Sequence, residues 1–482
     1  MNRKVLFLCA LPLFLSGCWK LGPDFIKPQY ADSSSWRYKE DNARNTSNTE
    51  WWRLIGDPVL NSLVDEAVAN NLDIKVAVAN VAAYVGKYGT SRANLLPQTS
   101  AVGDYNYLLA GGQQSQSGAV PTSQARGFIY LGGQAQWQLD LWGQLRRGME
   151  ATEGDLMAQA YSRDAVVLST VTELADQYIT LRAFDKSLEI TKSIVDLLHE
   201  QVKISRARAS LGYTSDVELY QAESELNRRQ AFIPLYKQQI AETEHAICVL
   251  LGRTPGPIKR GKTIDDLIAP IQPTGLPSDL LRRRPDVQQA EQQLAAATAR
   301  IGYNIGNYFP QITLTSTPGA SATSLADLAL PGAGFWSAGA MVMGPIFSAG
   351  KNAGLVQTAE AQEQSALESY KRTVLSSFQE YENAVVDTKM TKEQHDKQFS
   401  RLVAVKEYAR LSNLQFQEGE TAYLTVLDSV RNLFDAQSDL INAKKNMLTA
   451  SIEMYKAMGG GWILSAQEKS KMPAPPSASF YP

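Results

Sequence analysis

The feature that most constrains the fold is an internal repeat whose copies lie 213 positions apart. The segment 307–316, NYFPQITLTS, has Asn, Pro and Gln at the same places as the segment 94–103, NLLPQTSAVG. Pro97 and Pro310 are therefore equivalent positions. A repeat of this kind indicates one structural unit used twice. A length of 482 residues alone would suggest about three domains. The repeat argues against that division, because it predicts two copies of one unit.

In each copy a helical pattern ends at this proline and an alternating pattern follows. In the first copy the pattern predicts one helix that begins at Leu60. The helix of the second copy begins at Pro285, a residue type that favours the first position of a helix. Alternation predicts strands, which we place at about 98–110 and 126–141 in the first copy and 311–318 and 335–347 in the second. Stretches rich in Gly and Ser separate the members of each pair and indicate hairpin loops.

The strand predicted at 126–141 has two contrasting faces. Glutamines 134, 136 and 138 fall on one face. The opposite face is apolar and carries Ile129, Leu131, Trp137 and Leu139. Composition alone favours a β-hairpin of a soluble protein, with one face of the hairpin exposed to water. The alternative is a strand whose apolar face meets lipid and whose polar face meets water.

The longest helical patterns follow the strands. Between Gly354 and Gly419 there are 64 residues without a glycine or proline, and the stretch from Gly148 to Gly212 is nearly as regular. At ~1.5 Å per residue, 64 helical residues extend ~95 Å, which exceeds a compact domain. The sequence therefore predicts two helical hairpins, at 148–251 and 352–458.

Each hairpin is expected to turn at a glycine, because glycine adopts the left-handed conformation that ends helices. After Gly212, Ser215 is followed three residues later by an acid, which is the pattern of a capping box. After Gly419, Thr421 is expected to be the N-cap residue. Pro234 should kink the first return helix, and the second return helix has no counterpart.

The N-terminus indicates export and lipid attachment. Residues 1–17 begin with two basic residues and an apolar run at 5–15, which is typical of a signal peptide and too short to span a bilayer. The following LSGC resembles the lipobox of bacterial lipoproteins, in which Cys18 would become the lipidated N-terminus. In bacterial lipoproteins an Asp after this cysteine typically retains the protein in the inner membrane. Trp19 stands there instead, so the resemblance points to the outer membrane. The alternative is an ordinary signal-peptidase site.

Composition argues against several other functions. The net charge of −2 provides no basic field for nucleic acid. Without the signal peptide, Cys18 and Cys248 are the only cysteines, so no disulfide framework is expected. The three histidines fall on separate predicted helices, and we find no clustered nucleophile, acid and base. We therefore expect no metal, no cofactor and no enzymatic activity.

Four strands per chain limit how a membrane barrel could form. Unpaired strand edges in lipid cost several kcal/mol per group, and the smallest bacterial barrels have about eight strands. If these strands enter a membrane, several chains must combine into one pore. The glutamine face of the strand at 126–141 would then line water.

Several long motifs, in order, resemble the outer-membrane factor family (TolC/OprM-like), in its lipoprotein branch. They are EWWRLIGDPVLNSLVDEAVANNLDIKVA at 50–77, LPSDLLRRRPDVQQAEQQLAAATARIG at 276–302 with YFPQITLTS, and the turns at Gly212 and Gly419. The resemblance implies a homotrimer with a 12-stranded β-barrel in the outer membrane. A long α-helical barrel would continue it through the periplasm. It also implies a periplasmic membrane-fusion adaptor and an inner-membrane pump, driven by protons, as partners.

The resemblance also implies a gate at the periplasmic tip of the helices. Leu424, Asp428 and Arg431 are spaced i, i+4, i+7 in the second hairpin, where the family has its apolar and acidic constriction. The alternative is an ordinary surface heptad containing an i, i+3 ion pair. The same resemblance implies that the adaptor docks at the hairpin tips, around Gly212, Ser215, Gly419 and Thr421.

Together these observations predict a mainly α-helical protein with a membrane β-barrel, built from two repeats of helix, strand, strand, helix and helix. The function implied is a passive exit duct for small molecules, including drugs. A lipid-anchored envelope scaffold or adhesin without a pore is the alternative. The expected divisions are a signal peptide at 1–17, a lipidated segment at 18–56, repeats at 57–253 and 277–458, a linker at 254–276, and a tail at 459–482.

Overall fold

The structure is a computed structural model that describes residues 20–28, 50–110, 124–270 and 283–460. The predicted signal peptide and the predicted lipidation site Cys18 lie outside these residues. The chain divides into two compact units. Unit 1 comprises Met1–Pro28, Ala82–Ala158 and Ala290–Tyr370, and unit 2 comprises Gln29–Val81, Gln159–Gln289 and Lys371–Pro482. Each unit takes segments from both copies of the repeat, so the repeat does not correspond to two separate domains.

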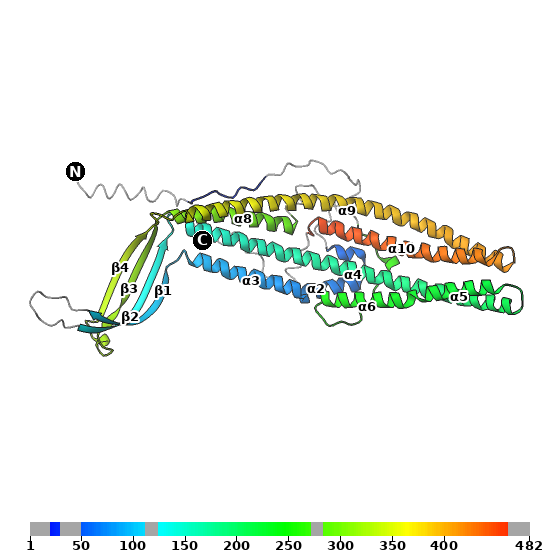
Figure 1. Cartoon of the computed structure of the whole chain (residues 1–482), viewed down its shortest axis with the longest axis horizontal. Helices are drawn as coiled ribbons and strands as arrows, with labels where there is room; N and C mark the ends of the chain where they lie inside the picture. Colours follow the sequence, from blue (N-terminus) through cyan, green and yellow to red (C-terminus); the bar gives the residue numbers. More distant parts are fainter. Residues whose placement is uncertain (1–19, 29–49, 111–123, 271–282, 461–482) are drawn as a thin grey trace, which may run out of the picture. The chain divides into compact units, whose positions relative to one another are not determined.

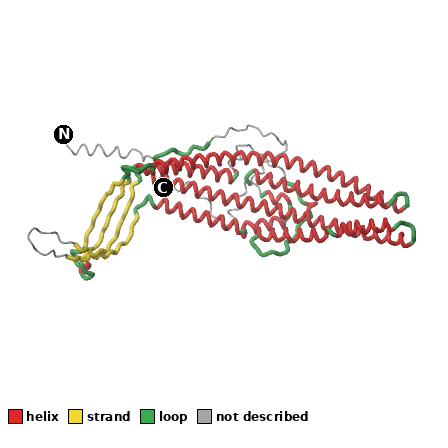
Figure 2. The backbone as a smooth tube through the Cα atoms, viewed as in Figure 1, coloured by secondary structure: helices red, strands yellow, loops and turns green. Residues whose placement is uncertain are grey.

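Unit 1 contains a four-stranded antiparallel sheet in the order β1-β2-β3-β4 (Figures 1 and 2). The strands are β1 Gln98–Ala110, β2 Gln124–Leu139, β3 Gln311–Ala322 and β4 Gly334–Met343. β1 and β3 begin directly after the two equivalent prolines. β1 and β4 are the edge strands of this described sheet.

Two strands end earlier than the alternating pattern suggests. β2 stops at Leu139 because Asp140 caps the next helix, accepting from the Leu145 N–H at 2.9 Å and the Arg146 N–H at 3.0 Å. β4 stops at Met343 and not near residue 347. Pro345 lies just beyond it and has no N–H to donate to a neighbouring strand.

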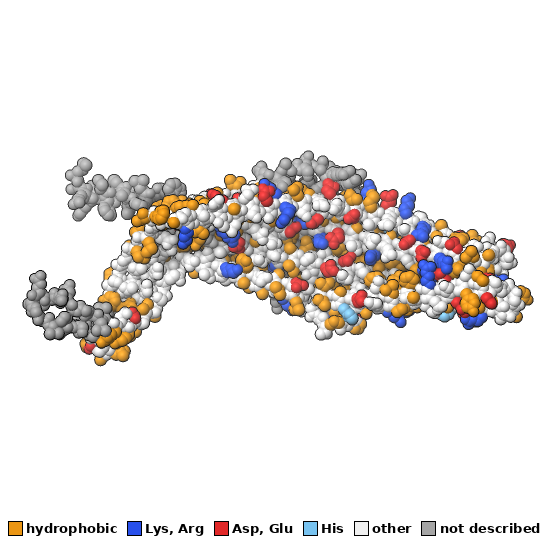
Figure 3. Space-filling view, in the orientation of Figure 1, with side chains coloured by type: hydrophobic (Ala, Val, Ile, Leu, Met, Phe, Trp, Pro, Cys, Tyr) orange, Lys and Arg blue, Asp and Glu red, His pale blue; other side chains and the backbone are white. Residues whose placement is uncertain are grey.

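The strand register brings the apolar residues of both repeat copies to one face of the sheet. Trp137 of β2 lies opposite Leu314 of β3, while Gln136 lies opposite Thr315. Because side chains alternate along a strand, these two pairs point to opposite faces. The first face is apolar and the second polar across the middle of the sheet. Figure 3 shows charged side chains over the helices and few over the strands.

The helices that precede the sheet differ between the copies. In the second copy α8 runs from Pro285 to Ile305. In the first copy the pattern predicted as one helix is two, α2 Pro58–Asn70 and α3 Leu72–Ala93. The single helix expected there is wrong, because the Asn71 side chain accepts from the Ile74 N–H at 3.0 Å. Its amide also donates to the Leu250 carbonyl at 2.8 Å.

The long helices α4 Gln144–Ser210 and α9 Lys351–Gln417 contain 67 residues each. At 1.5 Å per residue each extends ~100 Å. In Figure 1 the return helices α5 Asp216–Gln230 and α6 Phe232–Leu250 run back along α4. The second return helix, α10 Tyr423–Ala457, runs along α9. None of the helices among the described residues is long and apolar enough to cross a membrane.

The first return helix is interrupted where the sequence predicts. α5 ends at Gln230 and α6 begins at Phe232, so Pro234 lies in the first turn of α6. A proline tolerates that position because the N–H it lacks would have no partner there. The predicted kink at Pro234 is thus confirmed, and α10 is continuous over 35 residues.

The main core of unit 2 surrounds two tryptophans. Trp51 and Trp52 begin the short helix η1, Trp51–Ile55, and both are buried. The Trp51 ring stacks on Tyr455 of α10 with 6.0 Å between centroids. This contact packs the segment before the first repeat against the end of the second, and large buried side chains of this kind each contribute ~1.5–3 kcal/mol.

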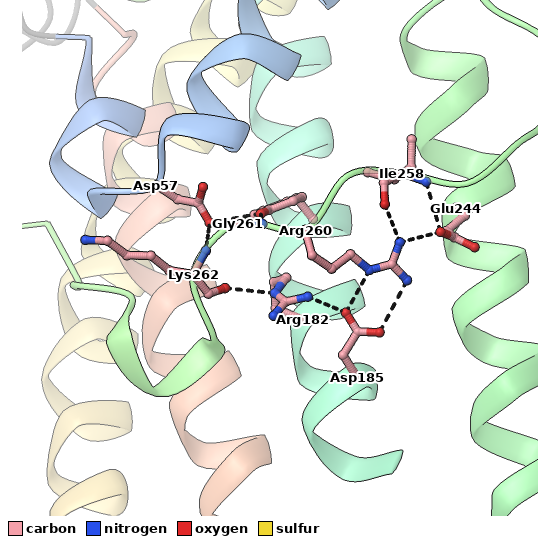
Figure 4. Close-up of polar contacts among 9 residues, drawn as sticks. Asp57, Arg182, Asp185, Glu244, Ile258, Arg260, Gly261 and Lys262 are labelled. Atoms are coloured by element: carbon pink, nitrogen blue, oxygen red, sulfur yellow. Dashed lines mark hydrogen bonds and ion pairs between the residues drawn. The ribbon is translucent and has the colours of Figure 1, made fainter. Parts of the chain in front are cut away.

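A buried carboxylate holds the segment that joins the two repeat copies (Figure 4). Asp57 caps α2 by accepting from the Val59 N–H at 2.8 Å. Its other oxygen accepts from the Tyr178 hydroxyl and the Lys262 N–H, both at 2.9 Å. Burial and the nearby Asp57 charge raise the pKa of Tyr178, so its hydroxyl stays protonated. A Cβ on Gly261 would lie 2.0 Å from Asp57 Oδ1, so a larger residue there would displace the carboxylate.

Charged side chains extend this cluster to the neighbouring helices (Figure 4). Arg182 of α4 donates to the Lys262 carbonyl at 2.9 Å. Arg260 bonds Asp185 of α4 at 3.0 Å and also pairs with Glu244 of α6. The joining segment is therefore tied to both helices.

Candidate functional site

The two hairpin turns use the same backbone motif. Gly212 and Gly419 have φ of 76° and 81°, the left-handed conformation. The residue after each glycine bonds back into the preceding helix, from the Tyr213 N–H to the Arg208 carbonyl at 2.9 Å in the first turn. The equivalent bond in the second turn joins residues 420 and 415 at 2.8 Å. Both turns thus have the pattern of a Schellman cap.

The N-cap position predicted for Ser215 is confirmed, whereas its side-chain capping bond and the N-cap predicted at Thr421 are wrong. Ser215 occupies the N-cap position of α5, but its side chain makes no capping bond. Thr421 is not the N-cap of α10, because Ala422 takes that place. In each turn the backbone already satisfies the N–H that a side chain would cap. The Glu218 N–H donates to the Ser215 carbonyl at 3.1 Å, and the Thr425 N–H donates to the Ala422 carbonyl at 3.0 Å.

An apolar cluster joins the two hairpins near their turns. Leu198 and Val202 of α4 belong to it together with Val426, Leu427 and Val430 of α10. All five side chains are buried. Burial of this kind stabilises the hairpin pair by roughly 1.5–3 kcal/mol per side chain.

A buried acid at the same level links the hairpins electrostatically. Glu225 of α5 is 1% exposed and bonds Arg229 and Arg431, each at 2.7 Å. The guanidinium of Arg229 also lies 4.0 Å above the Phe434 ring. Burial alone would raise the pKa of the Glu225 carboxyl, but hydrogen bonds from Arg431 and Arg229 outweigh it and lower that pKa. The carboxylate is therefore charged at neutral pH, and both arginines are neutralised.

Within one protomer, no described contact joins the three predicted gate residues to one another. Leu424 is 60% exposed, and Asp428 is exposed one turn further along α10. Asp428 accepts from the Tyr408 hydroxyl at 3.1 Å and from the Asn432 amide at 2.9 Å. Arg431 pairs with Glu225 of the first hairpin, so the i, i+3 ion pair with Asp428 is absent among the described contacts.

The first hairpin turn exposes a group of large apolar side chains. They are Leu211, Tyr213, Val217 and Tyr220, with exposed fractions of 64–77%. They surround Gly212 and the start of α5. Exposed clusters of this kind are typical of protein interaction surfaces.

The predicted lipid-facing residues of β2 lie on the apolar face that the register defines. Ile129, Leu131, Trp137 and Leu139 are alternate residues of one strand. Leu131 and Trp137 are 49% and 38% exposed. The Trp137 indole N–H donates to the Leu95 carbonyl at 2.9 Å, which leaves its ring available for apolar contacts.

Among the described residues, no group of three or more His, Cys, Asp or Glu side chains is placed to hold a metal ion. Cys248 is a buried free thiol whose Sγ lies 3.2 Å from the Gly256 carbonyl oxygen. This contact belongs to the packing of α6.

Comparisons with known proteins agree along nearly the whole chain. A family model described as outer membrane efflux protein matches residues 63–253 and 276–460. A toluene efflux pump outer membrane protein of Pseudomonas putida, TtgC, is 30% identical over 471 residues, covering 96% of both chains. The solved outer-membrane channel OprN has a TM-score of 0.84 and 26% identity, covering 92% of this chain and 99% of its own. The open state of the Neisseria gonorrhoeae MtrE outer membrane channel has a TM-score of 0.81 and 26% identity, covering 92% and 98%.

Proposed function

The chain belongs to the outer membrane efflux protein family, and on that premise we propose that it is the outer-membrane exit duct of a tripartite efflux system. The protein acts as a channel for small molecules and not as an enzyme. The observation that carries the proposal is the sheet of unit 1, whose register gives it one apolar and one polar face. Such a sheet suits a wall between lipid and water.

A homotrimer accounts for the edges of this sheet. One chain contributes four strands, with β1 and β4 at the edges. Pairing β4 of one copy with β1 of the next closes three chains into a barrel of 12 strands, which leaves no edge in lipid. Ile129, Leu131, Trp137 and Leu139 then face lipid, and Gln134, Gln136 and Gln138 line the pore. Lipidation at Cys18 adds a second attachment to the outer membrane.

The hairpins supply the periplasmic gate and the docking surface. Leu424 and Asp428 share an exposed face of α10, where three copies would meet about the axis. The bond between Arg431 and Glu225 holds α10 against the first hairpin in the closed state. The exposed apolar group around Gly212 receives the adaptor, which connects the duct to a proton-driven inner-membrane pump. The pump selects the cargo.

Reconstitution in planar bilayers tests this function. We expect the purified protein to be a trimer and to give ion conductance that is small at rest and rises when the Arg431–Glu225 bond is broken. A lipid-anchored scaffold or adhesin predicts no conductance under any condition. Fractionation of a Cys18→Ala variant gives a second test, because a barrel keeps the protein in the outer membrane without lipidation. Loss of that variant from the membrane fraction would mean that the strands do not insert.

A further inference from the structure

Residues 20–28, which we call the N-terminal strap, are bound to the helices of unit 1. Arg147 of α4 holds the strap at three places. Its guanidinium donates to the Leu21 carbonyl at 2.9 Å, to the Gly22 carbonyl at 3.1 Å and to the Asp24 carboxylate at 2.8 Å. The Arg147 side chain is only 4% exposed, and a buried guanidinium needs partners for its donors. The strap supplies them, so it occupies a site that the helix has built for it.

Two glycines let the strap cross α8 with backbone against backbone. Gly22 has a φ of 81°, the left-handed region, and a Cβ there would lie 2.5 Å from the Gly302 Cα. A Cβ on Gly302 would lie 2.3 Å from the Leu21 carbonyl oxygen. Neither position therefore has room for a side chain while the strap is docked. Further along, Lys27 pairs at 2.5 Å with Glu291 of α8, which is itself buried.

The strap starts at the end of the sheet where β2 leads into α4. The Leu21 N–H donates to the carbonyl of Trp142, which lies between these two elements, at 3.2 Å. The Trp142 ring packs on Phe309 with 5.2 Å between centroids, and its indole N–H donates at 2.7 Å to the carbonyl of Pro310, directly before β3. Aromatic side chains mark the membrane surfaces of barrels. In the proposed barrel the strap thus begins at the periplasmic membrane surface.

The short distance along the chain from the strap to Cys18 gives this placement a consequence. Cys18 precedes Lys20 by two residues, which span at most about 7 Å. If the whole strap were released, the next described residue would be Glu50, 32 residues after Cys18. The effective concentration that a flexible tether provides falls roughly as the −3/2 power of its length. A tether 16 times shorter therefore raises the effective concentration of the sheet at the membrane surface about 60-fold.

We propose that the N-terminal strap is a short tether, which links the lipid on Cys18 directly to the base of the sheet. Arg147 and Gly302 are its positioning residues. The proposal rests on the lipidation and the barrel of the proposed function. While the lipid is in the membrane, the docked strap keeps the ends of β2 and β3 at the membrane surface, so the strands enter lipid faster. Release of the strap leaves the lipid attached and lets the sheet move away.

Hydrogen exchange on the full-length protein in detergent tests the docking. The Leu21 amide should be protected in the wild type. Gly22→Val changes the strap and leaves both helices intact, so it should speed this exchange about tenfold or more. Ile26→Ala is the matched control, because that side chain lies in the same segment and is 83% exposed. Equally fast exchange in all three proteins would mean that the strap is not docked, and would overturn the proposal.

Insertion of the protein into phospholipid vesicles tests the tether, with the appearance of protease-resistant strands as the measured rate. In the lipidated protein Gly22→Val should slow insertion by about an order of magnitude, within the limit of about 60-fold. In the Cys18→Ala background it should not change the rate, because there is no lipid to tether. Equal slowing in both backgrounds would mean that the strap only stabilises the helices. No slowing in either would overturn the tether as well.

Arg147→Gln tests the same role from the side of the helix. It should slow insertion of the lipidated protein less than Gly22→Val, because the pair between Lys27 and Glu291 remains. Its matched control is Arg300→Gln, whose partner Asp155 joins α8 to α4 without contacting the strap. The control should insert at the wild-type rate, and equal slowing in the two arginine variants would contradict a specific role for Arg147.

Two further measurements separate the tether from the function on which it rests. Mass spectrometry should find the lipid on Cys18 in the wild type and in Gly22→Val, and its absence from the wild type would overturn the tether. Strands that never become protease-resistant in any variant would overturn the barrel, and the tether with it. Failure of the tether alone would leave strands that insert equally fast with and without Gly22→Val.

Discussion

The two hairpins of unit 2 share a turn motif and differ in their surfaces. The first turn exposes large apolar side chains, and the first return arm, α5 with α6, buries only seven residues in helices of 15 and 19 residues. The second turn has Glu418 and Glu420 beside its glycine, and α10 buries sixteen residues. The first return arm is also segmented, while α10 is continuous. The duplicated unit has kept its geometry and changed its contacts. We propose that the first turn docks the partner and that the second closes the channel.

The strongest test of this division is Glu225→Ala, because Glu225 joins the two hairpins. Removing it leaves Arg229, which is 2% exposed, without its closest partner. Breaking a buried pair in this way costs ~3–5 kcal/mol. We expect a large rise in single-channel conductance, whereas Arg431→Gln should have a smaller effect because Arg431 is partly exposed. Unchanged conductance in Glu225→Ala, with the trimer intact, would place closure elsewhere.

Acid provides a reversible form of the same test. The pKa of Glu225 is lowered in the folded state, so its contribution is complete above the ordinary glutamate pKa of ~4.3. That contribution is lost as the pH falls through the lowered value. Wild-type conductance should therefore be constant from neutral pH to about pH 5 and rise only below pH ~4. A rise near pH 6 would implicate another group.

The sheet differs from the hairpins in this respect, because its strands from the two repeat copies should be equivalent. Trp137→Arg in the first copy and Leu314→Arg directly opposite in the second should be equally harmful, costing ~2–4 kcal/mol near the bilayer midplane. Gln136→Arg and Thr315→Arg, the neighbouring pair on the polar face, are the matched controls and should be tolerated. The yield of folded trimer measures the effect. Equal damage in all four variants would show that the faces are assigned wrongly.

The combined variant Leu424→Ala, Asp428→Ala, Arg431→Ala tests closure by the second turn. It removes an apolar side chain from the exposed face of α10 and charge-assisted bonds worth ~1.5–3 kcal/mol each. We expect higher conductance and sensitivity to large antibiotics such as vancomycin. If conductance stays at the wild-type level, the constriction lies elsewhere, and the first hairpin around Asp216 is the next region to test.

Docking by the first turn predicts a separable defect. Tyr213→Ser with Tyr220→Ser removes two exposed aromatic side chains, so export in cells should fall by an order of magnitude while conductance in bilayers is unchanged. Leu197→Ser, at an exposed leucine of α4 away from the turns, is the control. Cross-linking to the adaptor should fall in parallel with export. A normal level of export would move the docking surface to the second turn.

The smallest effect is expected from Pro234→Ala, which makes the first return arm resemble α10. Restoring the missing N–H allows α5 and α6 to merge, so hydrogen exchange of residues 228–236 should slow several-fold. Conductance should hardly change. Faster exchange would mean that the proline stabilises α6 by fixing its first turn.

The sequence predicted those parts of the fold that depend on local patterns. The change of period at Pro97 and Pro310 located the starts of β1 and β3, and Pro234 located the break in the return arm. The family and its fold class are confirmed by the comparisons. The break at Asn71 depends in part on a bond to Leu250, and no local pattern reveals a contact at that separation.

The contacts at the hairpin tips were harder to predict, because they also join residues that lie far apart in the sequence. Glu225 and Arg431 are 206 residues apart, and in the sequence Glu225 and Arg229 look like an ordinary i, i+4 surface pair. The capping side chains were predicted from a short motif whose role the backbone fills. The roles of Leu424 and Asp428 stay predictions until the gate variants are measured.

The equal length of α4 and α9 implies a rule for insertions and deletions. The starts of β1 and β3 are 213 positions apart, whereas the starts of α4 and α9 are 207 apart, and so are their ends. The net length change since the duplication therefore lies between the start of each strand pair and its long helix, and the helices themselves kept one length. One residue added to α4 would rotate everything after it by about 100° and advance it 1.5 Å. β2 has 16 residues and β4 has 10, which matches the shift from 213 to 207 positions. Natural variants should therefore differ in length in the strand pairs and their connections, with any insertion in α4 matched by one in α9.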